Sequence, residues 1–196
     1  MLMDDLSEIN RRLLHNLWSL NNVKGNLIEP SHRLIIPQKR CGELRISEQE
    51  SVILYCDILN KLGYYYYSVE TPTEQVYRQS GSGKRSANTD LSLYIHDGLK
   101  FKKVGNIELK AHNTEMEKVK KDIEKIIREG ITANWFHTLK NVRSNTLPSL
   151  FSKFTKSFKA CSNLIDTDKR ISILFCFCVL EKRWGCIKHF SYDSSE

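Results

Sequence analysis

The sequence predicts an α/β protein in which helices cover both faces of a mixed central β-sheet. Between residues 46 and 181 the patterns follow the order helix, strand, strand, strand, helix, helix, strand. Two of these strands form a hairpin within residues 88–110. The segment from Ile171 to Leu180 is apolar on both faces, as expected of a strand buried inside a sheet. A sheet of this kind needs helices on both sides to shield it from water.

The N-terminal residues 4–21 are predicted to form an amphipathic helix. Its apolar residues recur at helical spacing, at Leu6, Ile9, Leu13, Leu17 and Leu20. We expect this helix to cap the protein's own core, and the alternative is an interaction or dimer contact. Residues 22–44 contain glycine and proline and form an irregular connection, with a short strand at residues 34–36. Residues 1–44 are thus expected to pack on an α/β domain of residues 45–196, giving a single domain.

A second helix is predicted from Ser47 to about Leu62. Ser47 and Glu50 match a capping box, in which each side chain binds a free backbone N–H at the helix start. Glu50 therefore has a structural task. Glu48 instead lies in line with the apolar face of the helix, where an acid is costly unless it has a ligand or partner. We choose Glu48 as the functional acid of this helix, and Glu50 is the alternative.

A strand and a basic segment follow this helix. Clustered tyrosines at residues 64–67 indicate the strand, and Pro72 marks an edge or a bend. Residues 78–88 are rich in glycine, serine and basic side chains, so we expect a mobile loop just before Asp90. Lys84 and Arg85 are candidates for holding a backbone phosphate of a nucleic acid, and a solvated loop is the equally weighted alternative.

The hairpin within residues 88–110 carries the main functional prediction. Apolar residues alternate with polar ones along both arms, at Leu91, Leu93, Ile95, Ile107 and Leu109. Asp97-Gly98 supplies the reversal. Pairing about Leu99 matches residues whose numbers sum to 198, which sets Asp90 opposite Glu108, with Cβ atoms roughly 4.5–5.5 Å apart. Two carboxylates this close repel one another, so we expect a divalent cation between them, with Lys110 on the same face.

Asp90 and the run Glu108-Leu109-Lys110 resemble the PD-(D/E)XK nuclease superfamily, which includes restriction endonucleases and archaeal Holliday-junction resolvases. The proline that usually precedes the first acid is replaced by Thr89. The resemblance extends from about Arg45 to Glu181, and the order αβββαβ is similar to the core of the family. It implies a restriction-endonuclease-like fold for residues 45–196. The implied activity is Mg²⁺-dependent hydrolysis of phosphodiesters, most simply by a DNA endonuclease with a restriction, defence or repair role.

The same resemblance implies roles for individual residues. Asp90 and Glu108 would bind Mg²⁺ or Mn²⁺, and the Leu109 carbonyl would add a ligand. Lys110 would orient or activate the attacking water and offset charge that grows on the phosphate. Glu48 would hold a second metal or its water. Two alternatives stay open: a surface ion-pair ladder that needs no metal, and a catalytically weak nucleic-acid-binding or scaffold subunit.

Two further helices are predicted at residues 115–129 and 147–165. The lysines of the first are interleaved with acids and are expected on a solvated outer face: Lys118, Lys120, Lys121 and Lys125. Between the helices, residues 131–141 are apolar and are expected to pack under the sheet or at a partner contact. The second helix carries Lys153, Lys156 and Lys159 with no acid before Asp166, which favours nucleic-acid contact slightly over a plain solvated face.

Composition sets the remaining expectations. The 196 residues suffice for one sizeable core, and their net charge of +7 favours a polyanionic partner such as DNA, with a homodimer or a larger complex left open. Six cysteines form no CxxC pair and no zinc spacing, and the chain opens with acidic rather than basic residues. We therefore expect a cytoplasmic protein with free thiols. The longest apolar run is about half the length of a membrane span, so no membrane segment is expected.

Overall fold

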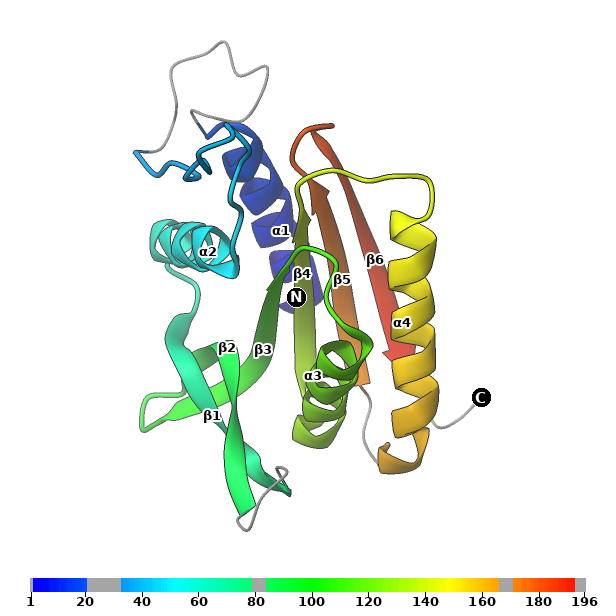
Figure 1. Cartoon of the computed structure of the whole chain (residues 1–196). Helices are drawn as coiled ribbons and strands as arrows, with labels where there is room; N and C mark the ends of the chain where they lie inside the picture. Colours follow the sequence, from blue (N-terminus) through cyan, green and yellow to red (C-terminus); the bar gives the residue numbers. More distant parts are fainter. Residues whose placement is uncertain (1, 21–32, 79–83, 166–170, 193–196) are drawn as a thin grey trace.

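The computed structural model describes residues 2–20, 33–78, 84–165 and 171–192, and Figure 1 shows the arrangement of their elements. The helices are α1 (Leu2–Trp18), α2 (Glu48–Leu62), α3 (Met116–Glu129) and α4 (Thr146–Cys161), with a short 3₁₀ turn at Ser162–Leu164. The strands are β1 (Tyr66–Arg78), β2 (Lys84–His96), β3 (Phe101–Ala111), β4 (Thr132–Leu139), β5 (Ile171–Val179) and β6 (Trp184–Tyr192).

The six strands form one mixed sheet in the order β1-β2-β3-β4-β5-β6. Strands β1, β2 and β3 are antiparallel, β3, β4 and β5 are parallel, and β6 is antiparallel to β5. Helices α3 and α4 lie side by side on one face of the sheet, and α1 and α2 cover the other (Figure 1). The predicted class, a mixed sheet flanked by helices, is confirmed. The order α2-β1-β2-β3-α3-β4 also follows an αβββαβ arrangement, but its last strand is β4 and not the predicted strand at residues 171–180.

Each face of the sheet has its own hydrophobic core. One core joins the apolar stripes of α1 and α2 to inward residues of β2 and β3, such as Leu91 and Leu109. The other joins α3 and α4 to Trp135, Ile173 and Phe175. Because strand residues alternate between faces, the burial of Leu109 under α1 and α2 directs Glu108 and Lys110 toward α3. The positions of the polar side chains thus follow from the packing of the apolar ones.

A buried amide pair fixes α1 against the centre of the sheet. Asn10 and Asn134 donate to each other's side-chain oxygens at 2.8 and 2.9 Å, and Asn134 also donates to the Tyr55 hydroxyl at 3.2 Å. Both asparagines are fully buried, so these bonds satisfy groups that would otherwise lose their water without compensation. These buried hydrogen bonds therefore connect α1, α2 and β4.

Several sequence expectations were wrong in detail. Residues 132–139, expected to pack under the sheet or at a partner contact, form the strand β4 inside it, and residues 184–192, for which no element was predicted, form the edge strand β6. The segment expected as a mobile loop before Asp90 is a strand from Lys84 onward, paired with the end of β1, while residues 79–83 lie outside the described residues. Residues 34–36 form no strand, and a single bridge joins Gln38 to Leu44 instead.

Two further observations concern the expected cellular setting. All six cysteines are free thiols. Among the residues that the structure describes, no helix is both long and apolar enough to cross a membrane.

Candidate active site between the β2–β3 hairpin and helix α3

The hairpin register next to the candidate acids follows the sequence prediction. Leu91 pairs with Ile107 and Leu93 with Gly105, so the residue numbers sum to 198. Beyond Leu93 the register shifts by one, and Tyr94 pairs with Lys103. This irregularity, typical of a β-bulge, lies on the side of the turn and leaves the pairing near Asp90 unchanged. The Asp90 carboxylate also accepts a 2.6 Å hydrogen bond from the Leu109 backbone N–H, which holds it over β3.

Lys110 lies among three carboxylates. Its Nζ is 3.6 Å from Asp90 Oδ2, 3.5 Å from Glu108 Oε2 and 3.3 Å from Asp122 Oδ2. The structure thus brings together the acids of the hairpin and the predicted lysine, and it adds an acid from α3. The Lys110 ammonium also lies 5.9 Å from the ring centroid of Trp135, a range in which cation–π attraction is favourable.

Helix α3 contributes a second lysine to this cluster. Lys125 Nζ lies 2.7 Å from Glu108 Oε1 and 3.1 Å from Asp122 Oδ1, and it donates a 2.7 Å hydrogen bond to the Asn88 carbonyl. Lys125 is only 7% exposed, so its expected place on a solvated outer face is wrong. The flank of α3 that carries Asp122 and Lys125 faces the polar side of the sheet. Helical spacing shows this flank in the sequence, but it does not show that the sheet lies against it.

The two acids at the start of α2 have different surroundings. Glu50 completes the capping box, because its Oε2 accepts from the Ser47 N–H at 2.8 Å and the Ser47 hydroxyl at 2.6 Å. Glu48 is half-buried at the edge of the charged cluster. Burial raises the pKa of Glu48, while Lys110 and a hydrogen bond from the Ala111 backbone lower it and Asp90 raises it further. Glu48 is therefore the α2 acid whose ionisation is coupled to Lys110 and Asp90.

Burial dominates the electrostatics of the cluster. It raises the pKa of Glu108 to about 8, with Lys125 opposing the shift and Asp122 and Asp90 adding to it. Burial alone would lower the pKa of Lys110, but the surrounding carboxylates outweigh it and the pKa is raised. The pKa of Lys125 is raised for the same reason, chiefly by Glu108 and Asp122. Both lysines therefore carry their protons at neutral pH.

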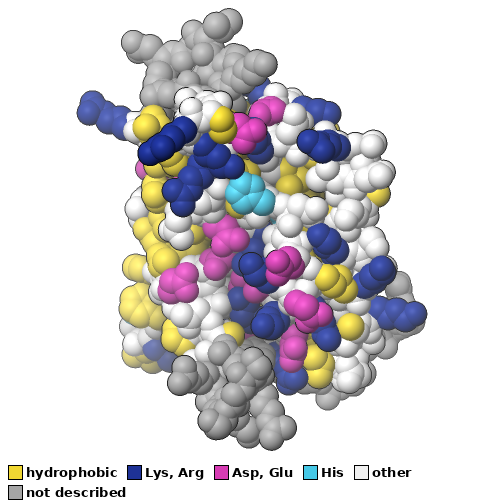
Figure 2. Space-filling model, viewed as in Figure 1, with side chains coloured by type: hydrophobic (Ala, Val, Ile, Leu, Met, Phe, Trp, Pro, Cys, Tyr) yellow, Lys and Arg dark blue, Asp and Glu magenta, His cyan; other side chains and the backbone are white. Residues whose placement is uncertain are grey.

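The carboxylate oxygens of the cluster are the type of ligand that a hard divalent cation prefers. Mg²⁺ prefers oxygen ligands and binds through as few as one or two carboxylates plus water and phosphate. Glu108 is fully buried, and both of its oxygens face ammonium groups, Lys125 at 2.7 Å and Lys110 at 3.5 Å. In the same part of the chain, no three His, Cys, Asp or Glu side chains are gathered closely enough to form a metal cluster. The ammonium groups of Lys110 and Lys125 stand between the carboxylates instead. Figure 2 shows this mixture of acidic and basic side chains at the centre of the face.

The other candidate phosphate-binding residues lie apart from this cluster or have no described side chain. Lys84 and Arg85 belong to the first part of β2, opposite Arg78 and Tyr77, and their side chains lie outside the described part of the structure. Lys153 of α4 donates at 2.7 Å to both the Asn113 side chain and the Thr114 carbonyl, so it ties α4 to the segment after β3. Lys156 and Lys159, also on α4, are exposed.

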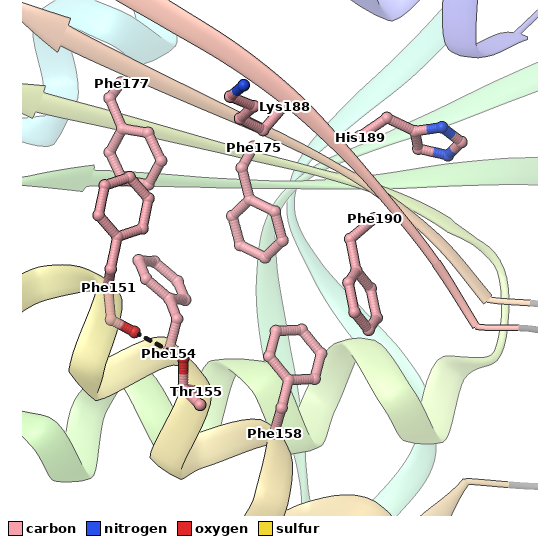
Figure 3. A pocket seen from close by; sticks show the side chains of 9 residues that line it. All are labelled: Phe151, Phe154, Thr155, Phe158, Phe175, Phe177, Lys188, His189 and Phe190. Carbon is pink, nitrogen blue, oxygen red and sulfur yellow. Dashed lines mark hydrogen bonds between the residues drawn. The ribbon is translucent and has the colours of Figure 1, made fainter.

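An apolar pocket of about 340 Å³ lies between α4 and the last two strands. Figure 3 shows that phenyl rings from both sides line it, with Lys188 and His189 on β6. The rings are those of Phe151, Phe154, Phe158, Phe175, Phe177 and Phe190. The pocket shares no lining residue with the charged cluster, and its lining is mainly phenyl rings rather than groups that could catalyse hydrolysis.

Comparisons with known proteins assign no family. No family model matches the chain, and no curated protein matches it. Among solved structures, that of SfsA from Pyrococcus furiosus in complex with Ca²⁺ is similar at 13% sequence identity and a TM-score of 0.30. The alignment covers 72% of this chain and 61% of that protein, so this chain spans less than two thirds of the length of the protein that it matches.

Proposed function

We propose that this protein is a metal-dependent phosphodiesterase that cleaves nucleic acid, and specifically a DNA endonuclease. The observation that carries the proposal is the meeting of Asp90, Glu108 and Lys110 on one side of two paired strands, with Lys110 within 3.6 Å of both acids. A metal-assisted cleavage site needs oxygen ligands beside a fixed cation that faces the reacting phosphate. The net charge of +7 supports a polyanionic substrate.

In this proposal Asp90, Glu108 and the Leu109 carbonyl hold Mg²⁺ or Mn²⁺. The bound ion would polarise the phosphate and lower the pKa of a bound water. Lys110, which three carboxylates keep charged, positions a phosphate oxygen or the attacking water and offsets negative charge in the transition state. Glu48 orients a water at the edge of the site. The six free thiols fit a reducing compartment such as the cytoplasm.

In this proposal Lys125 supplies a second fixed positive charge, beside that of Lys110. It is held by oxygens of Glu108, Asp122 and Asn88, with only 9% of its side chain exposed. When Asp90, Glu108, Asp122 and Glu48 are all ionised, two lysines leave an excess of two negative charges. One divalent ion neutralises that excess, so we propose a single-metal site. Titration calorimetry with Mn²⁺ should give a stoichiometry near one per chain.

A second candidate function follows from the same two lysines. Because Lys110 and Lys125 already neutralise part of the carboxylate charge, the chain would stay folded without a metal and could serve as a nucleic-acid-binding subunit with weak or no catalysis. A cleavage assay separates the two functions. Supercoiled plasmid and single-stranded DNA are incubated with the purified protein in Mg²⁺, Mn²⁺ or EDTA. The endonuclease nicks or linearises the plasmid only with metal, whereas the binding subunit retards DNA and leaves it intact.

A further inference from the structure

Three aromatic rings meet on the surface where β1 begins and the β2–β3 hairpin turns. The Phe101 ring centroid lies 4.9 Å from those of Tyr66 and His96, both in edge-to-face geometry, and Tyr66 lies 6.3 Å from His96. Tyr66 is 58% exposed and Phe101 is 57% exposed, so neither ring is part of a core. We call these three residues the aromatic platform. Hydrophobic side chains gather at the left margin of Figure 2, where Figure 1 places this hairpin.

The aromatic platform lies on the same face of the sheet as the candidate active site. Alternate residues of β2 share a face, so His96 points to the same side as Asp90. Tyr66 pairs with Tyr94, and Phe101 pairs with His96, which places both on that side as well. Six residues of strand separate Asp90 from His96, a distance of about 20 Å at the usual rise of a β-strand. The platform and the acids therefore lie on one face of the sheet, where Ser92 next to Asp90 is buried and Tyr94 is partly exposed.

The charges around the platform favour a negatively charged partner. Lys100 is exposed next to Phe101 at the hairpin turn, while the exposed Lys102 pairs with Ile95 and points to the other face of the sheet. The Asp97 carboxylate accepts hydrogen bonds from the Leu99 and Lys100 backbone N–H groups, both at 3.0 Å, so it is engaged within the turn. Exposed aromatic rings beside lysines are the arrangement by which proteins bind single-stranded nucleic acid, the rings stacking on bases and the lysines contacting phosphates.

We propose that the aromatic platform stacks unpaired nucleobases of the substrate, so that the preferred substrate contains a single-stranded segment leading into the site. This inference rests on the proposed function and names its substrate class. A duplex keeps its bases stacked on one another and offers no base face to Tyr66 or Phe101, whereas an unpaired strand does. The face between the platform and Asp90 carries hydroxyl groups, including Ser68 and Tyr94 with their oxygens 3.4 Å apart, so it presents hydrogen-bonding groups along the path of the strand.

The test measures binding of fluorescent DNA to the full chain in Ca²⁺, which stands in for Mg²⁺ and prevents cleavage. A single-stranded 20-mer is compared with the duplex of the same sequence. The variant Tyr66→Ala with Phe101→Ala should weaken single-strand binding between about five-fold and about 150-fold, the range expected for one lost base–aromatic stack. Duplex binding should change less than two-fold. Trp184→Ala, which removes a 41% exposed aromatic from the opposite edge strand β6, is the matched control and should change neither.

Other outcomes are equally decisive. Unchanged single-strand binding, or equal weakening for both DNAs, would overturn the platform as a base-stacking site. A dimer in sedimentation that Tyr66→Ala with Phe101→Ala dissociates would assign the platform to a second copy of the chain. If that variant unfolds, quenching of 2-aminopurine in a single strand bound to the unmodified protein still reports stacking. Platform-dependent binding without any cleavage in Mg²⁺ would reject the nuclease function alone, while cleavage with no single-strand preference would reject the platform alone.

Discussion

The ammonium group of Lys125 lies 2.7 Å from Oε1 of Glu108, and both side chains are buried. Glu108 comes from β3, the last strand of the β1-β2-β3 meander, and Lys125 from α3, the helix that follows it, so the contact joins two elements of the predicted αβββαβ core. It places a fixed positive charge beside a carboxylate that would otherwise be buried without a counter-charge. The stability of the protein and the ionisation of Glu108, the proposed metal ligand, are therefore linked through this one pair.

The first prediction concerns that link. Lys125→Met should lower the free energy of unfolding by about 3–5 kcal/mol at pH 9, where the Glu108 carboxyl with its pKa of about 8 is ionised, because it leaves that buried carboxylate without its closest counter-charge. Combining it with Glu108→Gln should cost clearly less than the sum of the two single changes, since the pair is then removed together. Urea unfolding measures all three variants. Lys121→Met, on the exposed side of α3, is the control and should stay within about 0.5 kcal/mol of the unmodified protein.

The second prediction separates the two acids of α2. Glu50→Ala should lower the free energy of unfolding by about 0.5–2 kcal/mol through loss of the capping box and should spare cleavage. Glu48→Ala should reduce the cleavage rate with little loss of stability, because Glu48 lies at the edge of the charged cluster. Thermal melts and a plasmid assay on both variants provide the measurements. The opposite pattern would show that Glu50 is the functional acid.

The third prediction concerns His137, which is buried in its neutral form. His137 Nδ1 accepts from the Trp135 indole N–H at 3.4 Å, and the other ring nitrogen contacts the His112 carbonyl. Burial lowers the pKa of His137 to about 4, with the His112 carbonyl opposing the shift and the charges of Lys110 and Lys153 adding to it. The unfolded chain therefore takes up this proton first as the pH falls. Stability is unaffected above about pH 6.5 and is lost between about pH 6.5 and 4, by up to about 3 kcal/mol.

Other groups titrate in the same range, so the His137 contribution is read as a difference between two proteins. Urea unfolding gives the free energy of unfolding of the unmodified protein and of His137→Gln, and the difference between the two values should become smaller as the pH falls from 7.5 to 5. A difference that stays constant over this range would mean that His137 takes up its proton equally in the folded and unfolded states.

The fourth prediction concerns the lysines of α4. If DNA contacts this helix, Lys156→Ala and Lys159→Ala should each flatten the plot of log K against log[salt] by about 0.9, measured with duplex DNA in Ca²⁺. Lys153→Ala should act mainly on stability, because its ammonium already bonds Asn113 and Thr114. Lys61→Ala, which removes the partner of Asp57 on α2, is the control. Slopes that match the control would make the α4 lysines a solvated face.

The sequence could predict the hairpin because its register is determined locally. Alternation of apolar and polar residues assigns the faces of Asp90, Glu108 and Lys110 without knowledge of the rest of the chain. Asp97-Gly98 marks the reversal, but the bulge that shifts the register by one between the turn and the acids is not visible in the sequence. The capping box at Ser47 and Glu50 is predictable for the same reason, since its two partners are three residues apart.

Strand β4 and the α3 contribution to the site depend on distant contacts. Residues 132–139 lie between two parallel strands and are buried on both faces, so they lack the alternation that marks a strand exposed on one side. Asp122 and Lys125 lie beside the apolar stripe of α3, and only the docked sheet shows that this flank faces Glu108 rather than solvent. Long-range packing, not local pattern, decides both.

The most direct test of the central claim is plasmid cleavage by Asp90→Asn and Lys110→Ala beside the unmodified protein. Asp57→Asn, which removes a surface carboxylate of α2 that pairs with Lys61, is the matched control. The account predicts cleavage in Mg²⁺ by the unmodified protein and the control, none in EDTA, and a loss of at least about 100-fold in both site variants, whose circular dichroism stays unchanged. Full activity in either folded site variant, or equal cleavage with and without Mg²⁺, would contradict it.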